Sequence, residues 1–428
     1  MQNTRKEYDV LVVGAGAAGM MAAINAGRKG ASVCLVEKNE KPGKKIYITG
    51  KGRCNVTNAC DTEDLFQNMV SNPKFMYSSF YAFTNWDAID FFENLGMPTK
   101  IERGNRVFPV SDKSSDVIRA LWDECKRLDV VIRFHCEVER LIKKDAQVCG
   151  AQIKGSQEQI FAKRTIVTTG GNSYQSTGSD GAGYRFAKDC GHRIVPCIPG
   201  LVPVNTVEQT PAKMQGLSMK NVEMTFYLEK NEKRKKLYQE FGEMMFTHFG
   251  LTGPIVLSAS SHIGSQFDKG TVLAVLDCKP ALDKEKLDRR IIRDFEGNPN
   301  VSLKNALGAL LPKSMIPVLL EITALDGKRP VHSITKEERE RMVTTIKGMT
   351  FTVASLRGWS EAIITRGGVS VSQINPSTME SKVMKHLYFA GEVLDLDAVT
   401  GGFNLQIAWS TGYLAAQSAV ESLQEINE

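Results

Sequence analysis

Three glycines near the N-terminus have a spacing that indicates a chemical role more clearly than any other residues of this chain. Gly14, Gly16 and Gly19 lie between an apolar run and a helix rich in small residues. In such a unit the first glycine makes the turn, the second lets the backbone approach a pyrophosphate, and the third lets the helix pack on the strand. The helix start presents N–H groups and the positive end of its dipole. The spacing predicts a dinucleotide-binding site.

An acidic residue indicates which dinucleotide is bound. Glu37 ends the second predicted strand, about 20 residues after the glycines, where an acid binds an adenosine ribose hydroxyl. A carboxylate at this position repels a 2′-phosphate. We therefore expect FAD or NAD at this site, and not NADP.

A basic, glycine-rich stretch at residues 38–58 follows directly after Glu37. Its glycines allow close approach of the backbone, and its lysine and arginine side chains supply positive charge for a diphosphate. The alternative is a solvated basic loop. The position directly after the acid-tipped strand favours a role in cofactor binding.

Two later strands also end in small residues that suit a bound ligand. The first is a predicted strand at 161–169 that ends at Thr169, Gly170 and Gly171. The second, at 385–390, meets Gly391 and Glu392, and a glycine pair then precedes a predicted helix at 407–419. A helix N-terminus behind glycines repeats the logic of the first site. The C-terminal stretch is therefore predicted to close the cofactor site.

The spacing of apolar residues predicts the elements that position these groups. We expect strands at 10–13, 32–36, 130–134, 137–143 and 148–153, and helices at 15–28, 86–95 and 116–128. From about residue 194 the chain becomes rich in proline and β-type residues, with a hairpin whose strands at 222–228 and 237–241 flank a charged tip at 229–236. Residues 283–347 read as helical, with Pro299, Pro312 and Pro317 as breaks and a capping box at Thr335 and Glu338.

Composition excludes several classes of protein. The chain has 428 residues, 42% of them hydrophobic, and a net charge of +6, which permits an anionic partner without arguing for one. Its nine cysteines form no CxxC pair and its six histidines no HxxxH pair, so we expect no metal site, no dithiol and a reducing, cytoplasmic location. The alanine-rich N-terminal run carries the glycine motif and is interpreted as core, not as a signal peptide. We expect no membrane-spanning helix.

With these residues in view, the chain resembles the flavoproteins related to glutathione reductase, and more narrowly the BaiN/YhiN, aminoacetone-oxidase-like family of FAD-dependent oxidoreductases. The most specific matches are GKGRCNVTN at 50–58, FTHFGLTGP at 246–254 and FAGEVLDLDAVTGGFNLQIA at 389–408. The resemblance implies an α/β fold with a Rossmann-like FAD-binding domain at 1–195 and 348–428. It also implies an inserted β-barrel-like domain at 196–280 and a small helical domain at 281–347.

The resemblance also implies which residues contact FAD. The glycine loop and Glu37 are expected to contact the ADP half of FAD, and the backbone of Val138 is expected to contact the adenine. Asp395 and residues 402–406 are expected to contact the ribityl chain and the pyrimidine end of the flavin. The full set of expected cofactor-binding residues is Gly14, Gly16, Ala17, Ala18, Glu37, Lys38, Gly43, Lys44, Lys45, Thr49, Gly50, Gly52, Arg53, Cys54, Asn55, Asn58, Val138, Thr169, Gly170, Gly171, Gly391, Glu392, Asp395, Gly402, Phe403, Asn404, Leu405 and Gln406. One departure is Lys51, where the family more often has glycine.

The expected activity is flavin-dependent oxidation–reduction of a small molecule by hydride transfer at flavin N5, with NAD(P)H or an amine-like substrate as donor. His248 is the candidate catalytic residue, and Tyr174, Arg106 and Glu392 are further candidates on the substrate side. The alternatives are modification of RNA and a non-enzymatic flavin redox sensor. A nucleic-acid partner is not favoured, because the basic hairpin tip carries no interleaved aromatic residues. The substrate, the electron acceptor and the oligomeric state stay open.

Overall fold

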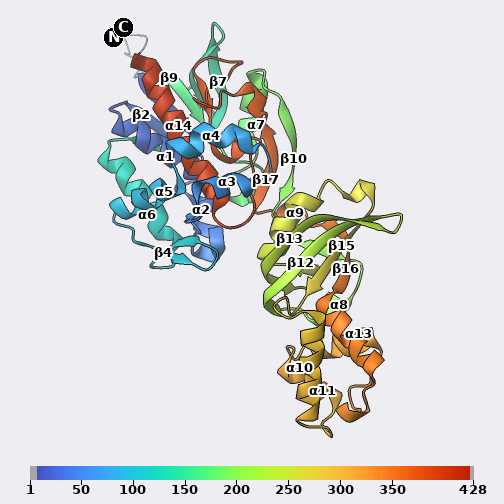
Figure 1. Cartoon of the computed structure of the whole chain (residues 1–428). Coiled ribbons are helices and arrows are strands. Elements are labelled where there is room, and N and C mark those ends of the chain that lie inside the picture. Colours follow the sequence, from blue (N-terminus) through green and yellow to red (C-terminus); the bar gives the residue numbers. More distant parts are fainter. Residues whose placement is uncertain (1–6, 425–428) are drawn as a thin grey trace, which may run out of the picture. The chain divides into compact units, whose positions relative to one another are not determined.

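The computed structural model describes residues 7–424, and these divide into two compact units (Figure 1). Unit 1 comprises residues up to Gly200 together with those from Ala362 onward, and unit 2 comprises Leu201–Glu361. Each unit has its own hydrophobic core. The chain therefore leaves unit 1, builds unit 2, and returns to complete unit 1.

Unit 1 is built on a twisted, mostly parallel sheet of seven strands, as a Rossmann-like fold requires. The strand order is β6 (Val131–Arg133), β2 (Val33–Val36), β1 (Glu7–Val13), β9 (Gln159–Val167), β8 (Gln147–Ile153) and β7 (Val138–Lys144), with β18 (Leu387–Phe389) beside β9. Val13 lies opposite Val36 on one side and Val167 on the other, and Val167 in turn lies opposite Phe389. Four parallel strands thus end at one edge of the sheet. The predicted α/β class with a Rossmann-like domain is confirmed.

Two helices far apart in the sequence cover one face of this sheet. α1 (Ala17–Arg28) and α14 (Phe403–Gln424) contact each other and both contact β1 and β9. A Cβ at Gly412 would lie 2.5 Å from the carbonyl oxygen of Ala18, so glycine is required where the two backbones meet. The first helix starts two residues later than predicted, and the last helix four residues earlier, directly after the positive φ values of Gly401 and Gly402.

The remaining elements of unit 1 surround the sheet. They include α2 (Lys44–Ile48), α3 (Thr62–Gln67), α4 (Tyr77–Ala82), α5 (Asn85–Asn94), α6 (Ser114–Arg127) and α7 (Ala182–Asp189). A small antiparallel sheet has the order β3 (Thr57–Asn58), β5 (Arg106–Pro109) and β4 (Thr99–Glu102), and a second pairs β10 (Ile194–Gly200) with β17 (Ile364–Val369). Within unit 1 these elements support the loops that follow the strands of the seven-stranded sheet.

Unit 2 contains a closed antiparallel barrel (Figure 1). Its strands follow the order β11 (Val204–Thr206), β14 (Gly250–Thr252), β13 (Lys233–Phe246), β12 (Ser218–Lys230), β15 (Thr271–Asp277) and β16 (Met349–Leu356), with α8 (Thr210–Lys213) and α9 (Pro254–Ile263) against them. The β12–β13 hairpin is longer than predicted. Its turn is only Asn231 and Glu232, both with positive φ as in a type I′ turn, so most of the charged residues stand on the strands.

A helical module in unit 2 follows the barrel strand β15. It consists of α10 (Lys284–Glu296), α11 (Leu303–Ala306), α12 (Met315–Thr323) and α13 (Lys336–Lys347). The capping box of Thr335 and Glu338 is confirmed, since each side chain bonds the other residue's backbone N–H. Pro317 does not break a helix, because it lies in the first turn of α12, where no intrahelical N–H bond is lost.

The boundaries of the units differ from those predicted. Unit 2 begins at Leu201 instead of 196 and ends at Glu361 instead of 347. The larger difference arises from β16, which pairs with β15 and β11 and buries Met349, Phe351 and Val353 in the barrel core. The first predicted boundary falls inside β10, which belongs to unit 1 through its pairing with β17. Among residues 7–424, no helix is long and apolar enough to cross a membrane.

Candidate functional site

The glycine loop between β1 and α1 has the geometry that its spacing predicted. Gly14 has φ +105°, donates its N–H to the carbonyl of Val36 at 2.8 Å, and would place a Cβ 2.8 Å from the carbonyl oxygen of Thr168. A Cβ at Gly19 would lie 1.8 Å from the carbonyl oxygen of Gly14. Only glycine fits at either position, so the turn and the helix–strand packing both depend on them.

Gly16 is different, because the space around it is open. A Cβ there would meet no atom within 4 Å, and no side chain caps α1, whose N-cap is Gly16. This is a cradle in which a ligand can reach the backbone N–H groups at the start of a 12-residue helix. The residues present therefore fit the pyrophosphate of a dinucleotide.

Glu37 is buried and holds the loop beside this cradle. One of its carboxylate oxygens accepts the N–H of Ala15 at 2.8 Å, and the other accepts the backbone N–H and the side-chain amide of Asn39 at 2.9 and 2.6 Å. A carboxylate offers about four lone-pair sites, so one acceptor site is left for a ribose hydroxyl. The carbonyl of Glu37 accepts the N–H of Cys136 at 2.9 Å, which brings the buried Val138 to the same edge. Both residues thus lie near the glycine loop, and their contact with adenosine stays a prediction.

The cations expected at the diphosphate already have anionic partners in the described chain. The ion pairs join Lys38 to Asp180 at 2.8 Å, Lys44 to Glu40 at 3.4 Å, Lys45 to Glu392 at 2.5 Å, and Arg53 to Glu102 and Asp112. Paired side chains contribute less net charge to a ligand than free ones. The contact of these cations with a diphosphate stays a prediction.

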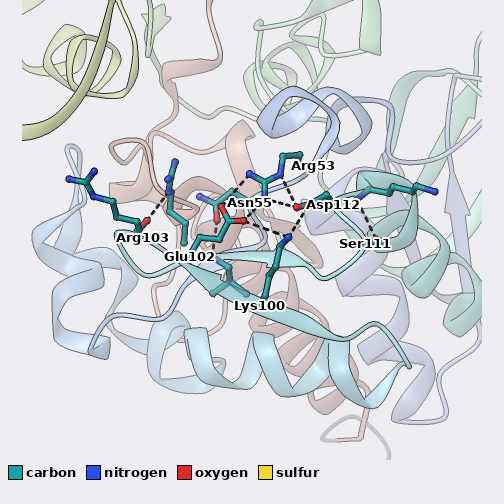
Figure 2. Close-up of polar contacts among 10 residues, drawn as sticks. Arg53, Asn55, Lys100, Glu102, Arg103, Ser111 and Asp112 are labelled. Atoms are coloured by element: carbon teal, nitrogen blue, oxygen red, sulfur yellow. Dashed lines mark hydrogen bonds and ion pairs between the residues drawn. The ribbon is translucent and has the colours of Figure 1, made fainter. Parts of the chain in front are cut away.

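Arg53 belongs to a network that braces its own loop (Figure 2). Its guanidinium donates to Asp112 at 2.8 Å and to Glu102 at 3.2 Å, Lys100 donates to Asp112 at 2.7 Å, and the ring of Phe108 lies 4.2 Å from the guanidinium carbon. The hydrogen bonds of this network raise the pKa of Arg53 and lower the pKa values of both carboxylates. The structure thus joins Arg53 to β4 and the segment after β5.

Asn55 and Asn58 brace the same region. The side-chain oxygen of Asn55 accepts the N–H of Val107 at 3.2 Å, and the amide of Asn58 donates to the carbonyl of Gly401 at 3.0 Å. The bond from Asn58 joins the end of the GRCN loop, residues 52–58, to the C-terminal glycine pair. These two residues therefore position the loops of the site through their side chains.

The backbone at residues 50–54 carries an unusual concentration of left-handed conformation. Gly50, Lys51, Gly52 and Cys54 have φ values of 61°, 57°, 85° and 59°. Gly50 and Gly52 adopt this conformation without the Cβ penalty that Lys51 and Cys54 carry. Cys54 is fully buried, and burial raises its pKa to about 12, so its thiol is neutral at pH 7.

Lys51→Gly is expected to stabilise the protein, because it removes the left-handed strain of an exposed side chain. The strain is about 1–2 kcal/mol, and the added flexibility of the unfolded chain offsets roughly 0.5–1 kcal/mol of it. Urea unfolding should therefore show a gain of up to about 1.5 kcal/mol. Lys51→Ala keeps the strain and is the control; equal stability of the two variants would contradict the explanation.

The C-terminal glycines close tightly around the loops of unit 1. A Cβ at Gly391 would lie 2.8 Å from the Cβ of Ala18, and one at Gly402 would lie 2.4 Å from the carbonyl oxygen of Thr57. The side chain of Asn404 bonds the backbone of Ala398 in both directions, at 3.0 and 2.8 Å. The stretch before α14 is therefore fixed against the GRCN loop and α1, as the sequence predicted in outline.

The side chain of Gln406 is fully buried and forms hydrogen bonds within the protein. It accepts from Thr57 at 2.6 Å and donates to the carbonyl of Phe83 at 3.2 Å and to Ser410 at 2.9 Å. Its backbone N–H also has a partner, the carbonyl of Gly402 at 3.1 Å, so contact between Gln406 and a cofactor stays a prediction. The carboxylate of Asp395 accepts from Asn72 at 3.1 Å, and burial raises its pKa above the usual range.

The strand end after β9 also fits a polar ligand. Gly170 has φ +72°, and a Cβ at Gly171 would lie 2.3 Å from the hydroxyl of Thr365. The buried hydroxyl oxygen of Thr169 has no hydrogen-bond partner within residues 7–424. A buried polar atom without a partner is rare, and a bound ligand would satisfy it.

The substrate-side candidates have different environments. Tyr174 has φ +55° and is held in unit 1, where its ring centroid lies 5.9 Å from the ammonium of Lys45. Arg106 donates to the carbonyl of Arg103 at 3.0 Å on the small sheet. His248 belongs to unit 2, where it is exposed between β13 and β14 with its ring edge-on to Phe249. The catalytic role of His248 stays a prediction.

Sequence reasoning missed two residues of this site, Ser173 and Thr365. Thr365 accepts the backbone N–H groups of Asn172 and Ser173 at 2.7 and 3.1 Å, and the hydroxyl of Ser173 donates to Glu392 at 2.8 Å. The position of Ser173, two residues after Gly171, was an available signal. Thr365 lies in β17 without any local motif, so only the fold reveals it.

Comparisons with known proteins agree with this architecture. The family described as "HI0933-like protein Rossmann domain" matches residues 8–418. A 3-dehydro-bile acid delta(4,6)-reductase of Clostridium scindens is 32% identical over 96% of this chain and 98% of its own length. A ribosomal RNA dihydrouridine synthase of Escherichia coli is 29% identical over 97% of this chain and 98% of its own length.

A solved structure shares the fold at low sequence identity. The 3-ketosteroid-Δ4-(5α)-dehydrogenase of Rhodococcus jostii aligns with a TM-score of 0.54 and 15% identity, covering 98% of each chain. At this identity the likeness concerns the fold alone.

Proposed function

Because the chain belongs to the HI0933-like family, a family of flavoprotein oxidoreductases, we propose that it is an FAD-dependent reductase of a carbon–carbon double bond conjugated to a carbonyl group. The observation that carries the cofactor assignment is the open cradle at Gly16, which faces the uncapped start of α1 beside Glu37. Gly16, Glu37, Thr169 and the glycines before α14 would hold the FAD. Bound flavin supplies the hydride at N5.

The chemistry that two relatives share supports the choice of substrate class. The name of the first, a delta(4,6)-reductase of a 3-dehydro-bile acid, denotes reduction of double bonds in a molecule with a 3-oxo group. The second is named a dihydrouridine synthase, and dihydrouridine is uridine with its C5–C6 double bond reduced. That bond is conjugated to the C4 carbonyl. Reduction of a double bond conjugated to a carbonyl takes a hydride at a carbon of the conjugated system, and a proton.

We propose a nicotinamide dinucleotide as the source of the hydride. The chain contains one complete glycine–acid fingerprint, and FAD takes it. NAD(P)H would then bind transiently, without a fingerprint of its own. An amine-like donor is the alternative that the first experiment tests.

The first experiment follows the visible spectrum of the purified protein under anaerobic conditions. We expect flavin bands that bleach on addition of NADH or NADPH and return on addition of 4-androstene-3,17-dione or of unmodified ribosomal RNA. Bleaching by an amine and not by NAD(P)H would contradict the proposal and indicate an oxidase. A colourless protein that FAD does not reconstitute would contradict the cofactor assignment.

A uridine in RNA is a second candidate substrate, and the β12–β13 hairpin favours it. Lys230, Lys233, Arg234, Lys235 and Lys236 are all exposed along this ribbon. Only Arg234 forms an ion pair among them in the described chain, with Glu229 at 2.8 Å. A basic ribbon of this kind binds phosphates without reading sequence.

Removing the positive charges of the β12–β13 hairpin should distinguish RNA from a small conjugated ketone as the substrate. If RNA is the substrate, a variant with Lys233, Lys235 and Lys236 changed to Gln should bind RNA at least about 10-fold more weakly, with a shallower salt dependence. Its reduction of 4-androstene-3,17-dione should be unchanged. The control changes the exposed Lys284, Lys313 and Lys336 of the helical module to Gln. Equal RNA binding by both triple variants would contradict the role of the hairpin.

A further inference from the structure

Four polar residues in unit 1, contributed by segments far apart in the sequence, form one hydrogen-bonded cluster. It consists of Lys45 on α2, Ser173 after β9, Thr365 on β17 and Glu392 after β18. Its members are joined by hydrogen bonds across sequence separations of up to 347 residues. A catalytic role for this cluster rests on the proposed function, the flavin-dependent reduction of a conjugated double bond.

The cluster lies beside the glycine loop. The N–H of Gly43, the N-cap of α2, donates to the carbonyl of Ala15 at 2.9 Å. Gly391, which precedes Glu392, comes within contact of Ala18 on α1. Two of the four segments that build the cluster therefore start beside the glycine loop and the first turn of α1.

The carboxylate of Glu392 is held rigidly. One oxygen accepts the hydroxyl of Ser173 and the backbone N–H of Thr365, each at 2.8 Å, and the other accepts the ammonium of Lys45. The side chain of Glu392 is 20% exposed. Its orientation is thus fixed by three donors from three different segments.

Lys45 has one donor to spare. Its ammonium carries three N–H groups, and in the described chain one bonds Ser173 at 2.6 Å and one bonds Glu392. The side chain of Lys45 is 25% exposed, and the ring of Tyr174 lies to one side of the ammonium. The remaining N–H can reach a ligand without breaking either bond.

We propose that Lys45 donates a hydrogen bond and then a proton to the carbonyl oxygen of the substrate. As a hydride from the nicotinamide-reduced flavin arrives at the β-carbon, the electron pair of the double bond shifts toward the carbonyl, and the oxygen takes a proton from Lys45 to give an enol. The enol then returns to the ketone, or to the amide in uracil, as the α-carbon takes a proton from solvent and the oxygen returns its proton to Lys45. Ser173 and Glu392 are positioning residues.

Other cations near the glycine loop are less suited to this task. Arg53 is shared between Glu102 and Asp112, and Lys38 is paired with Asp180. Lys45 is distinguished by a hydroxyl and a fixed carboxylate that orient its ammonium while leaving a donor open. A preorganised donor of this kind stabilises developing negative charge at low reorganisation cost.

The test separates the two half-reactions of the holoenzyme by stopped-flow spectroscopy. In Lys45→Met, recolouring of the reduced flavin by the acceptor that works for the unchanged protein should slow by about 100-fold or more. Bleaching by NAD(P)H and the affinity for FAD should change by less than about 3-fold. Lys45→Arg should restore part of the lost rate, and Ser173→Ala should show a smaller loss. Lys41→Met, on the exposed loop before α2, is the matched control.

A binding measurement adds a readout that does not depend on turnover. A para-chlorophenolate resembles the enolate, and its binding to the oxidised holoenzyme can be followed by a charge-transfer band. We expect Lys45→Met to weaken this binding at least 10-fold and Lys41→Met to leave it unchanged.

The outcomes separate the role of Lys45 from the proposed function. Unchanged recolouring and phenolate binding in Lys45→Met would overturn the role of Lys45, and so would a loss of FAD affinity of the same size as the loss of rate. If no conjugated carbonyl recolours the unchanged protein, the proposed function fails instead, whatever the variants do.

Discussion

Gly16→Ala is expected to abolish useful FAD binding and leave the fold intact. The backbone at Gly16, with φ −83° and ψ −164°, is open to any residue, and the added Cβ meets no protein atom within 4 Å. The methyl group would stand in the cradle where a pyrophosphate must approach the backbone. We expect FAD affinity to fall by at least about 100-fold, which corresponds to about 2.7 kcal/mol. Fluorescence titration with FAD measures the affinity, and circular dichroism measures the Tm without added FAD.

Gly19→Ala provides the contrast, since its Cβ would lie 1.8 Å from the carbonyl oxygen of Gly14. This substitution should destabilise unit 1 by roughly 3 kcal/mol or more, whether or not FAD is present. If Gly16→Ala lowers the Tm as much as Gly19→Ala does, the cradle is part of the packing, and the assignment of the FAD site there loses its main support.

Alkaline pH is expected to unfold unit 1 through its buried thiols. Burial raises the pKa values of Cys54 and Cys125 to about 12, from an ordinary value of 9.0. Between these values the folded state keeps protons that the unfolded state has lost, so stability is fully present below pH 9 and falls as the pH rises toward 12. Two thiols together give a slope of roughly 3 kcal/mol per pH unit. Urea unfolding at pH 8, 9.5 and 10.5 measures it.

The double variant Cys54→Ala and Cys125→Ala is the control for this prediction. It keeps the other groups that titrate in this range, Cys60 among them, whose pKa burial raises to about 11, and its slope should be shallower by roughly 3 kcal/mol per pH unit. An equal slope in the two proteins would show that the thiols are not the cause. The free energy of unfolding at pH 7 does not test this prediction, because both thiols are neutral in the folded and the unfolded chain at that pH.

The parts of the site that the sequence predicts best depend on short-range backbone geometry. The roles of Gly14, Gly16 and Glu37 are encoded within one strand–helix–strand unit, where spacing alone fixes which atoms meet. The glycine pair before α14 obeys the same logic, and its contact with Thr57 follows once the GRCN loop and the last helix share one site. The fold class follows from the same local patterns.

The parts that escape the sequence depend on partners distant in the chain. The ion pairs of Arg53 could not be predicted, because nothing in the sequence indicates that Glu102 and Asp112 lie beside it. The role of Thr365 is visible only in the folded structure, where β17 lies against Gly171. The boundary at 347 was missed for a similar reason, since β16 is assigned to the barrel by its pairing with β15 and not by its own residues.

The order of the segments along the chain sets the order of events during synthesis. The glycine loop is made before unit 2, whereas β18 and α14, which complete the sheet and pack on α1, are made after it. Unit 1 can therefore be completed only after all of unit 2 has been synthesised. A chain that terminates within unit 2 would lack β18 and would expose the face of α1 that α14 covers.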